Sequence, residues 1–293
     1  MKCDLHIHTE YSFDATETID MILSLAHKNG LDVLAVSDHN EIEGSLELLE
    51  KVENSGLSAI SGIEIDCFFE GTVIHLLGYG CDLRHPDFSK LKEHYLRELN
   101  RISRERLEKI NAHYGFELDE NRIREKAAGK PVTNVQITQV MLETQQHPDL
   151  EIYKNGEKSA NPIAAFYWDN LAWGCWGYTE LCLPDYRQVI DLVHRHHGAL
   201  IVAHPVQTIG MDEKVCDRLL EEGVDGFEVY SSYHDEKARS FYRKYCEKHG
   251  LVQTFGSDFH GSVKPNIQLG QTGMELDCSK DYQSLLDKIS EYR

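Results

Sequence analysis

Short apolar runs alternate with amphipathic stretches along most of this chain. Seven runs have the length and composition of strands, at residues 2–8, 33–37, 57–66, 73–79, 200–203, 225–230 and 252–256. In the stretches after the first two, residues 19–26 and 42–52, apolar side chains recur at helical spacing. This alternation predicts βα units built on a parallel sheet, and seven strands can close a barrel.

Glycines mark the expected helix ends. Such a residue follows a helical stretch at Gly30, Gly56, Gly198, Gly223 and Gly250. A helix commonly closes on a left-handed residue, so we expect that conformation at these positions.

Residues 84–184 interrupt the pattern. Residues 88–114 predict one long helix, and residues 115–183 a small helical module that ends in the aromatic stretch 166–178. Rings at this density favour a small core over a ligand surface. Because barrels vary their function through loops at one face, we expect the insertion to form a cap over that face. The expected domains are therefore a barrel of residues 1–83 and 185–293 and a cap of residues 84–184.

Size, charge and cysteines narrow the class of protein. The 293 residues suit one barrel with an insertion, and the net charge of −19 argues against binding of long nucleic acid. The eight cysteines form no C-x-x-C pair, which predicts reduced thiols and a cytoplasmic protein. Since no apolar run approaches the roughly 20 residues of a membrane helix, we expect no membrane association. The oligomeric state is not predicted.

Histidines and carboxylates follow the predicted strands in order. The candidate metal ligands are His6, His8, Asp14, His39, Glu64, His75, His204, Asp258 and His260. His6 and His8 lie two apart in a strand and can therefore present two imidazoles to one ion. Most of the set falls at the carboxyl ends of strands, the face that carries the active site in an α/β barrel. Nine ligands exceed the need of one ion, which predicts a polynuclear, hydrolytic centre of Mn²⁺, Fe²⁺ or Zn²⁺.

These motifs, in this order, resemble the PHP (polymerase and histidinol phosphatase) superfamily of metal-dependent phosphoesterases. The resemblance covers residues 1–83 and about 185–270. It implies a distorted (βα)7 TIM-like barrel and a trinuclear centre. One ion would be held by His6, His8, Glu64 and Asp258, a second by Asp14, His39 and His260, and a third by Glu64, His75 and His204. Glu64 would bridge two ions, and the expected nucleophile is a metal-bridging hydroxide. Glu64, Asp258 and His204 are the expected catalytic residues.

Other polar residues near the motifs have less specific roles. Asp38 is expected to orient an imidazole from outside the ligand set, and Asp4 to do the same or to hold a strand edge. Glu228 ends a strand on the same face, where a functional and a surface role are equally expected. Candidate substrate contacts are Tyr11, Ser12, Asn40 and Gln207. Candidate anion partners are Arg122, Arg124, Lys130 and Lys264, each of which more often is an ordinary surface cation.

The residues and the resemblance together predict a phosphoesterase. We expect its substrate to be a small phosphomonoester or cyclic phosphodiester, such as a sugar phosphate or nucleotide. Alternatives are a nucleotide 3'-phosphatase or short-oligonucleotide exonuclease, a histidinol phosphate phosphatase, an amide hydrolase, and a non-enzymatic metal-binding regulatory domain. The run His204-Pro205-Val206-Gln207 lacks the basic residue that grips a second phosphate in related enzymes, which argues against a bisphosphate nucleotide.

Overall fold

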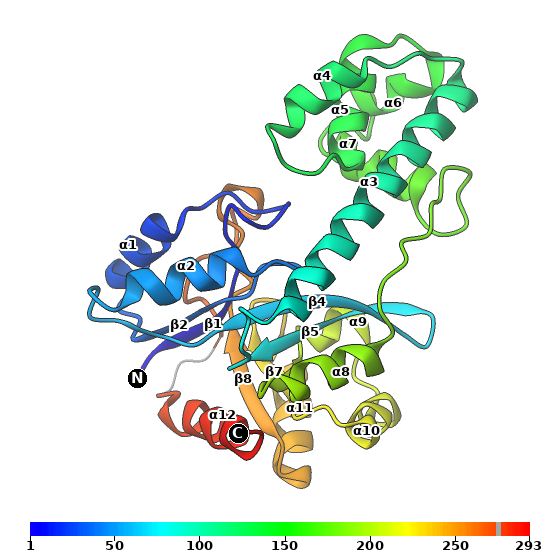
Figure 1. The fold of residues 1–293 in the computed structure, drawn as a ribbon. Helices are drawn as coiled ribbons and strands as arrows, with labels where there is room; N and C mark the ends of the chain where they lie inside the picture. Colours follow the sequence, from blue (N-terminus) through cyan, green and yellow to red (C-terminus); the bar gives the residue numbers. More distant parts are fainter. Residues whose placement is uncertain (274–276) are drawn as a thin grey trace. The chain divides into compact units, whose positions relative to one another are not determined.

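The fold is known from a computed structural model, which describes residues 1–273 and 277–293. The described residues form two compact units (Figure 1). The core unit consists of Met1–Lys92 and Leu183–Arg293, and the insertion unit of Glu93–Cys182. No helix among the described residues is long and apolar enough to cross a membrane.

Two sheets form the centre of the core unit. The first is parallel, in the order β1 (Cys3–Ile7), β2 (Val33–Val36) and β3 (Ser58–Ala59). The second has the order β4 (Gly62–Phe69), β5 (Thr72–Tyr79), β6 (Ala199–Val202), β7 (Gly226–Ser231) and β8 (Val252–Gly256). The described strands are therefore eight, against the seven expected. The run at 57–66 is not one strand, because it breaks at Ile60 and Ser61, where β3 leaves one sheet and β4 enters the other.

The second sheet is mixed, so the expectation of a parallel sheet was wrong there. β4 pairs antiparallel with β5, and β5 antiparallel with β6. Only Glu70 and Gly71 connect β4 to β5, with φ values of 48° and 85°. A two-residue connection of this kind makes a tight hairpin and leaves no room for a crossover helix.

Hydrogen bonds join the two sheets in two places. After β8, the Asp258 amide donates to the His6 carbonyl, and the His8 amide donates to the Phe259 carbonyl, both at 2.9 Å. After β2, the Asn40 amide donates to the Glu64 carbonyl at 2.7 Å. The carboxyl ends of β1, β2 and β8 and the first residues of β4 are thereby held together.

Helices pack around the sheets with their apolar faces inward. In the core unit they are α1 (Ile19–Asn29), α2 (Glu43–Val52), α8 (Tyr186–Arg195), α9 (Pro205–Thr208), α10 (Glu213–Glu222), α11 (Glu236–His249) and α12 (Ser279–Glu291). Gly30, Gly56, Gly223 and Gly250 have the expected left-handed conformation. Gly198 does not, because His197 takes the positive φ of 64° instead. Gly198 is instead required for space, since a Cβ there would lie 2.2 Å from the Cys81 sulfur.

The insertion unit is helical. The long helix α3 (Pro86–Tyr114) begins in the core unit, and the shorter helices gather along its second half (Figure 1). They are α4 (Glu120–Ala127), α5 (Asn134–Thr144), α6 (Glu151–Lys154) and α7 (Pro162–Phe166). Phe166 and Leu171 are buried among apolar side chains of these helices. The aromatic stretch is nevertheless not simply a core, because Trp168 is 70% and Trp173 80% exposed.

Candidate metal centre

The nine predicted ligands converge on one region of the core unit. His6 and His8 come from β1 and the residue after its end, His39 follows β2, His204 follows β6, and Asp258 follows β8. Parallel strands bring their carboxyl ends to one edge, which is why residues so far apart in sequence meet. Asn40, His204 and Asp258 have positive φ values of 52°, 24° and 58°. Such backbone strain in residues other than glycine is concentrated at functional sites.

A first group consists of His6, His8, Glu64 and Asp258, all buried. The Nε2 atom of His8 lies 3.1 Å from Glu64 Oε2 and 3.0 Å from Asp258 Oδ1. The Nε2 atom of His6 lies 3.2 Å and 3.3 Å from the same two oxygens. A tetrahedral ion with bonds of about 2.0–2.1 Å separates its ligand atoms by about 3.3–3.4 Å. The four side chains therefore have nearly the spacing that one shared ion requires.

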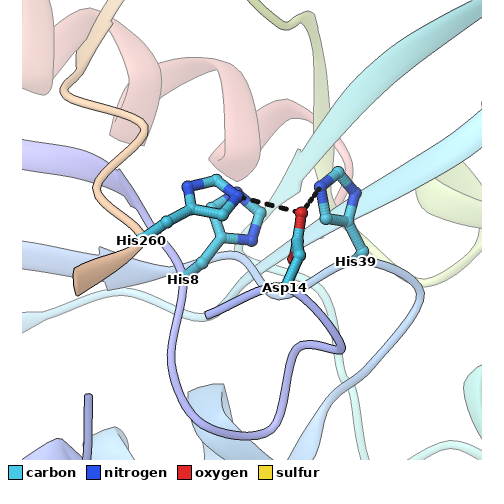
Figure 2. A group of neighbouring side chains, drawn as sticks. All are labelled: His8, Asp14, His39 and His260. Carbon is cyan, nitrogen blue, oxygen red and sulfur yellow. Dashed lines mark ion pairs between the residues drawn. The ribbon is translucent and has the colours of Figure 1, made fainter. Parts of the chain in front are cut away.

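A second group consists of His8, Asp14, His39 and His260. Figure 2 shows the Asp14 carboxylate between the rings of His39 and His260, with His8 beside His260. Asp14 Oδ2 lies 3.3 Å from His260 Nε2 and 3.7 Å from His39 Nε2. His8 therefore lies close to both groups, whereas the resemblance gave it to the first alone.

A third group consists of His39, Glu64 and His75. Glu64 Oε1 lies 3.0 Å from His75 Nδ1 and 3.2 Å from His204 Nε2, while Oε2 lies 3.3 Å from His39 Nδ1. His204 thus lies beside Glu64 as expected. The third group, whose ligand atoms all lie within 4.8 Å of one another, nevertheless contains His39 and not His204. Glu64 stands at the centre of the site, with five imidazoles around its two oxygens.

Buried polar atoms in these groups are left without hydrogen bonds. They are His6 Nε2, both ring nitrogens of His8, Glu64 Oε2, His204 Nδ1 and His260 Nε2. Leaving a buried polar atom unpaired is costly, so such atoms are rare in folded proteins unless an ion or water satisfies them. Imidazole nitrogens and carboxylate oxygens are suitable ligand atoms for divalent cations.

Opposite charges dominate the electrostatics of the site. Burial disfavours a charged Glu64, but His39, His6 and His75 outweigh it and hold the pKa of Glu64 well below its usual value. Burial also opposes protonation of His6, yet Glu228, Glu64 and Asp258 raise the pKa of His6 well above its usual value. Burial and the neighbouring His260 lower the pKa of His8 to about 4. Glu64 is thus ionised at neutral pH, as metal binding requires.

Two further carboxylates orient histidines of the site. Glu228 Oε1 lies 3.0 Å from His6 Nδ1, and Glu228 Oε2 accepts from the His204 amide at 2.7 Å. Asp66 Oδ1 lies 3.0 Å from His39 Nδ1. Contacts of this kind set the tautomer and direction of a metal-binding imidazole. Asp66 was missed in the sequence, although it lies two residues after Glu64 on the same strand and therefore on the same face.

Asp258 has two partners on its outer oxygen. The Tyr233 hydroxyl donates to Asp258 Oδ2 at 2.5 Å, and the Lys264 ammonium lies 2.7 Å from the same atom. Lys264 also donates to the Tyr233 hydroxyl at 2.9 Å. Asp258 Oδ1 remains directed at His6 and His8. Tyr233 was not predicted, because it lies in a connection without a recognisable motif.

Asp38 and Asp4 hold backbone segments rather than imidazoles. Asp38 accepts from the amide and hydroxyl of Thr9, both at 2.7 Å, so the expectation that it orients an imidazole was wrong. Asp4 accepts from the Ser257 amide at 2.9 Å, the Ser257 hydroxyl at 2.6 Å and the Gly270 amide at 2.7 Å. Asp4 thus ties β1 to the segment that carries Asp258, the second of its two expected roles.

The predicted substrate contacts are engaged mostly within the protein. Ser12 donates to Asp14 at 2.7 Å, Asn40 donates to Asp66 at 3.0 Å, and Tyr11 donates to Glu47 at 2.7 Å. Ser12 and Asn40 therefore orient ligand-bearing segments, while Gln207 lies exposed on α9.

Of the candidate anion partners, Lys264 contacts the site. Arg122 pairs with Glu143 at 2.9 Å and Arg124 with Glu120 at 2.5 Å, and both belong to the insertion unit with Lys130.

The chain is similar to several known proteins. The 5'-3' exoribonuclease Rnm of Escherichia coli is 27% identical over 92% of the chain and 88% of its own length. The phosphoribosyl 1,2-cyclic phosphate 1,2-diphosphodiesterase of Eggerthella lenta is 26% identical over 88% of the chain and 94% of its own length. A crystal structure from Bifidobacterium adolescentis, assigned as a metal-dependent phosphoesterase, shares the fold with a TM-score of 0.75 at 22% identity, covering 98% of this chain and 96% of that one.

The mixed α/β fold and its cluster of histidines and carboxylates define a metal-dependent hydrolase of phosphate esters. The PHP domain model matches residues 4–292, and the chain belongs to this family.

Proposed function

We propose that the chain hydrolyses a small phosphomonoester or cyclic phosphodiester, such as a sugar phosphate or a nucleotide. The observation that carries this proposal is the buried centre around Glu64 with the Lys264 ammonium at its rim. Two or three Mn²⁺, Fe²⁺ or Zn²⁺ ions would neutralise the carboxylates, and Lys264 would add one positive charge for an anionic substrate. A centre of this kind suits a substrate that carries its charge on one phosphate.

For the ligands of each ion we keep the division that the family resemblance implies, which differs from the structural groups at His8, His39 and His204. His6, His8, Glu64 and Asp258 would hold one ion, Asp14, His39 and His260 a second, and Glu64, His75 and His204 a third. When bound, the ions activate water as the nucleophile and neutralise charge on the phosphate.

The remaining residues prepare the site for this chemistry. Glu228 and Asp66 direct His6 and His39. Tyr233 and Lys264 occupy the outer oxygen of Asp258 and leave its inner oxygen for the ligand role.

We also propose an architecture for the core unit and a role for the insertion unit. The hydrogen bonds that join the two sheets in two places support a distorted TIM-like barrel, with the site at its carboxyl-terminal face. The insertion unit would serve as the cap.

Replacing Lys264 should weaken substrate binding without removing the ions. In Lys264→Met, we expect KM to rise about tenfold, or ~1.4 kcal/mol, because the cation beside the phosphate is lost. Steady-state kinetics with a phosphomonoester checks this, with elemental analysis of the same sample. Lys248→Met, on the surface helix α11, is the matched control. An unchanged KM would remove Lys264 from the substrate site.

A short-oligonucleotide exonuclease is the second candidate, and the likeness to the Escherichia coli exoribonuclease favours it. The two candidates differ in how rate depends on length. A net charge of −19 disfavours binding of long polyanions, so we expect kcat/KM to fall as an oligonucleotide lengthens beyond a few residues. A series of 5'-labelled oligoribonucleotides of increasing length, with a phosphorylated sugar as competitor, measures this. Values that rise steadily with length would make the protein a nuclease.

Amide hydrolysis differs from both phosphoesterase candidates in its product, which is ammonia and not phosphate. Phosphate and ammonia are measured in parallel across a mixed panel of phosphate esters and amides with added Mn²⁺. Release of ammonia without phosphate would overturn the proposed function.

A further inference from the structure

A second cluster of metal-binding side chains lies outside the proposed centre. It consists of His85, Asp87 and His196, whose ligand atoms all lie within 4.8 Å of one another. Asp87 Oδ2 lies 3.2 Å from His196 Nε2 and 3.6 Å from His85 Nδ1. The two imidazole rings lie side by side, with centroids 4.0 Å apart. These separations bracket the roughly 3.3–3.4 Å between ligand atoms of a tetrahedral Zn²⁺ ion.

The cluster lies at the opposite end of the sheet from the proposed active site. His196 precedes β6, whose first residue, Ala199, pairs with the last residue of β5, Tyr79. His204 follows the carboxyl end of the same strand. At about 3.3 Å per residue, the four residues of β6 alone separate the two ends by roughly 10 Å or more. The two groups therefore do not share ligands or an ion.

The charges around Asp87 leave one of its oxygens for a cation. The Lys90 ammonium lies 2.9 Å from Oδ1, so Oδ2 is the oxygen directed at both imidazoles. Arg195 also lies 3.6 Å from Oδ2, but its other guanidinium nitrogen pairs with Asp191, so a bound ion would displace this one long ion pair. Lys90 and His196 hold the pKa of Asp87 at about 2, so this carboxylate is ionised at neutral pH.

The imidazoles suit a ligand role as well. His85 Nδ1 accepts a weak hydrogen bond from the Asp87 amide at 3.3 Å, so this nitrogen is unprotonated, and a bound ion would replace that hydrogen bond. The His196 side chain is only 10% exposed and lies against the buried ring of Phe88. His85 is 42% exposed, which leaves room for water at a fourth position. Two imidazoles, one carboxylate and one water form a common Zn²⁺ coordination set.

We propose that His85, Asp87 and His196 bind one Zn²⁺ ion that is separate from the catalytic ions. The ion would fasten the first turn of α3 to the end of α8. These are the helices by which the chain leaves the core unit and returns to it around the insertion.

Zn²⁺ counting in matched variants tests this proposal. The full chain, His85→Ala and His196→Gln are dialysed against the same free Zn²⁺ and analysed for bound metal. We expect each variant to hold one ion fewer than the unchanged chain. His27→Ala, which removes an exposed histidine of α1, should hold the full number. Lys90→Gln should bind Zn²⁺ at least as tightly, because a competing cation is removed.

Thermal unfolding gives a second, independent measurement. Zn²⁺ should raise the Tm of His85→Ala less than that of the unchanged chain, because one ion bound to the folded state is missing. Equal ion counts in the unchanged chain and both histidine variants would overturn the proposal, and the cluster would then be a hydrogen-bonded contact between helix ends. Because only bound Zn²⁺ is counted, the result does not depend on whether the chain hydrolyses phosphate esters.

Discussion

Glu64→Gln should abolish turnover while the chain still folds. Glu64 offers two carboxylate oxygens, one within 3.1–3.3 Å of His6, His8 and His39 and the other near His75 and His204. An amide has the same shape but one oxygen, and its NH₂ group cannot bind a cation. The variant therefore cannot hold two ions with comparable charge balance, so kcat should fall by much more than tenfold.

The measurement is kcat on a phosphate ester with Mn²⁺ in excess, together with circular dichroism to establish the fold. Glu70→Gln is the matched control, because Glu70 lies in the turn after the same strand, is about half exposed and pairs with Arg218. If Glu64→Gln kept more than a tenth of the original kcat, the activation free energy would have risen by less than about 1.4 kcal/mol. That result would show that Glu64 does not bridge two ions.

The order of motifs predicted much of the candidate site. A ligand at the end of a parallel strand is brought to the others by the sheet itself, so His6, His39 and Asp258 could be placed together without knowledge of any packing. Glu64 was predicted by the same logic, but that placement was wrong, because Glu64 lies near the start of β4, a strand that pairs antiparallel with β5. Residues at the ends of parallel strands are specified by local pattern together with topology.

The contacts around the ligands were less predictable. Tyr233 lies in the connection between β7 and α11, and its contact with Asp258 depends on the course of that connection. Hydrophobic periodicity does not predict the course of such a connection. Asp38 is next to His39 in sequence but faces Thr9, because adjacent residues of an extended chain point to opposite sides. The exposure of Trp173 was also missed, because composition alone does not say which aromatic rings find partners.

Removal of metal should abolish hydrolysis, and Mn²⁺ should restore it. The candidate centre holds buried nitrogens and oxygens that no protein group satisfies, among them His6 Nε2, His8 Nε2 and Glu64 Oε2. Cations that satisfy them also supply the positive charge that an anionic substrate needs. Chelation, followed by stepwise addition of Mn²⁺ with the rate measured at each step, checks this. Activity that survives exhaustive chelation would contradict a metal-dependent mechanism.

The number of ions bound in the active protein tests the central claim most directly. It is best counted by elemental analysis of metal-replete His85→Ala, in which the second cluster cannot contribute, alongside phosphate release from the same sample. Nine candidate ligands, Glu64 among them, predict two or three ions per chain with full hydrolytic activity. At most one ion per chain, in a sample that hydrolyses phosphate esters at the full rate, would contradict the polynuclear centre.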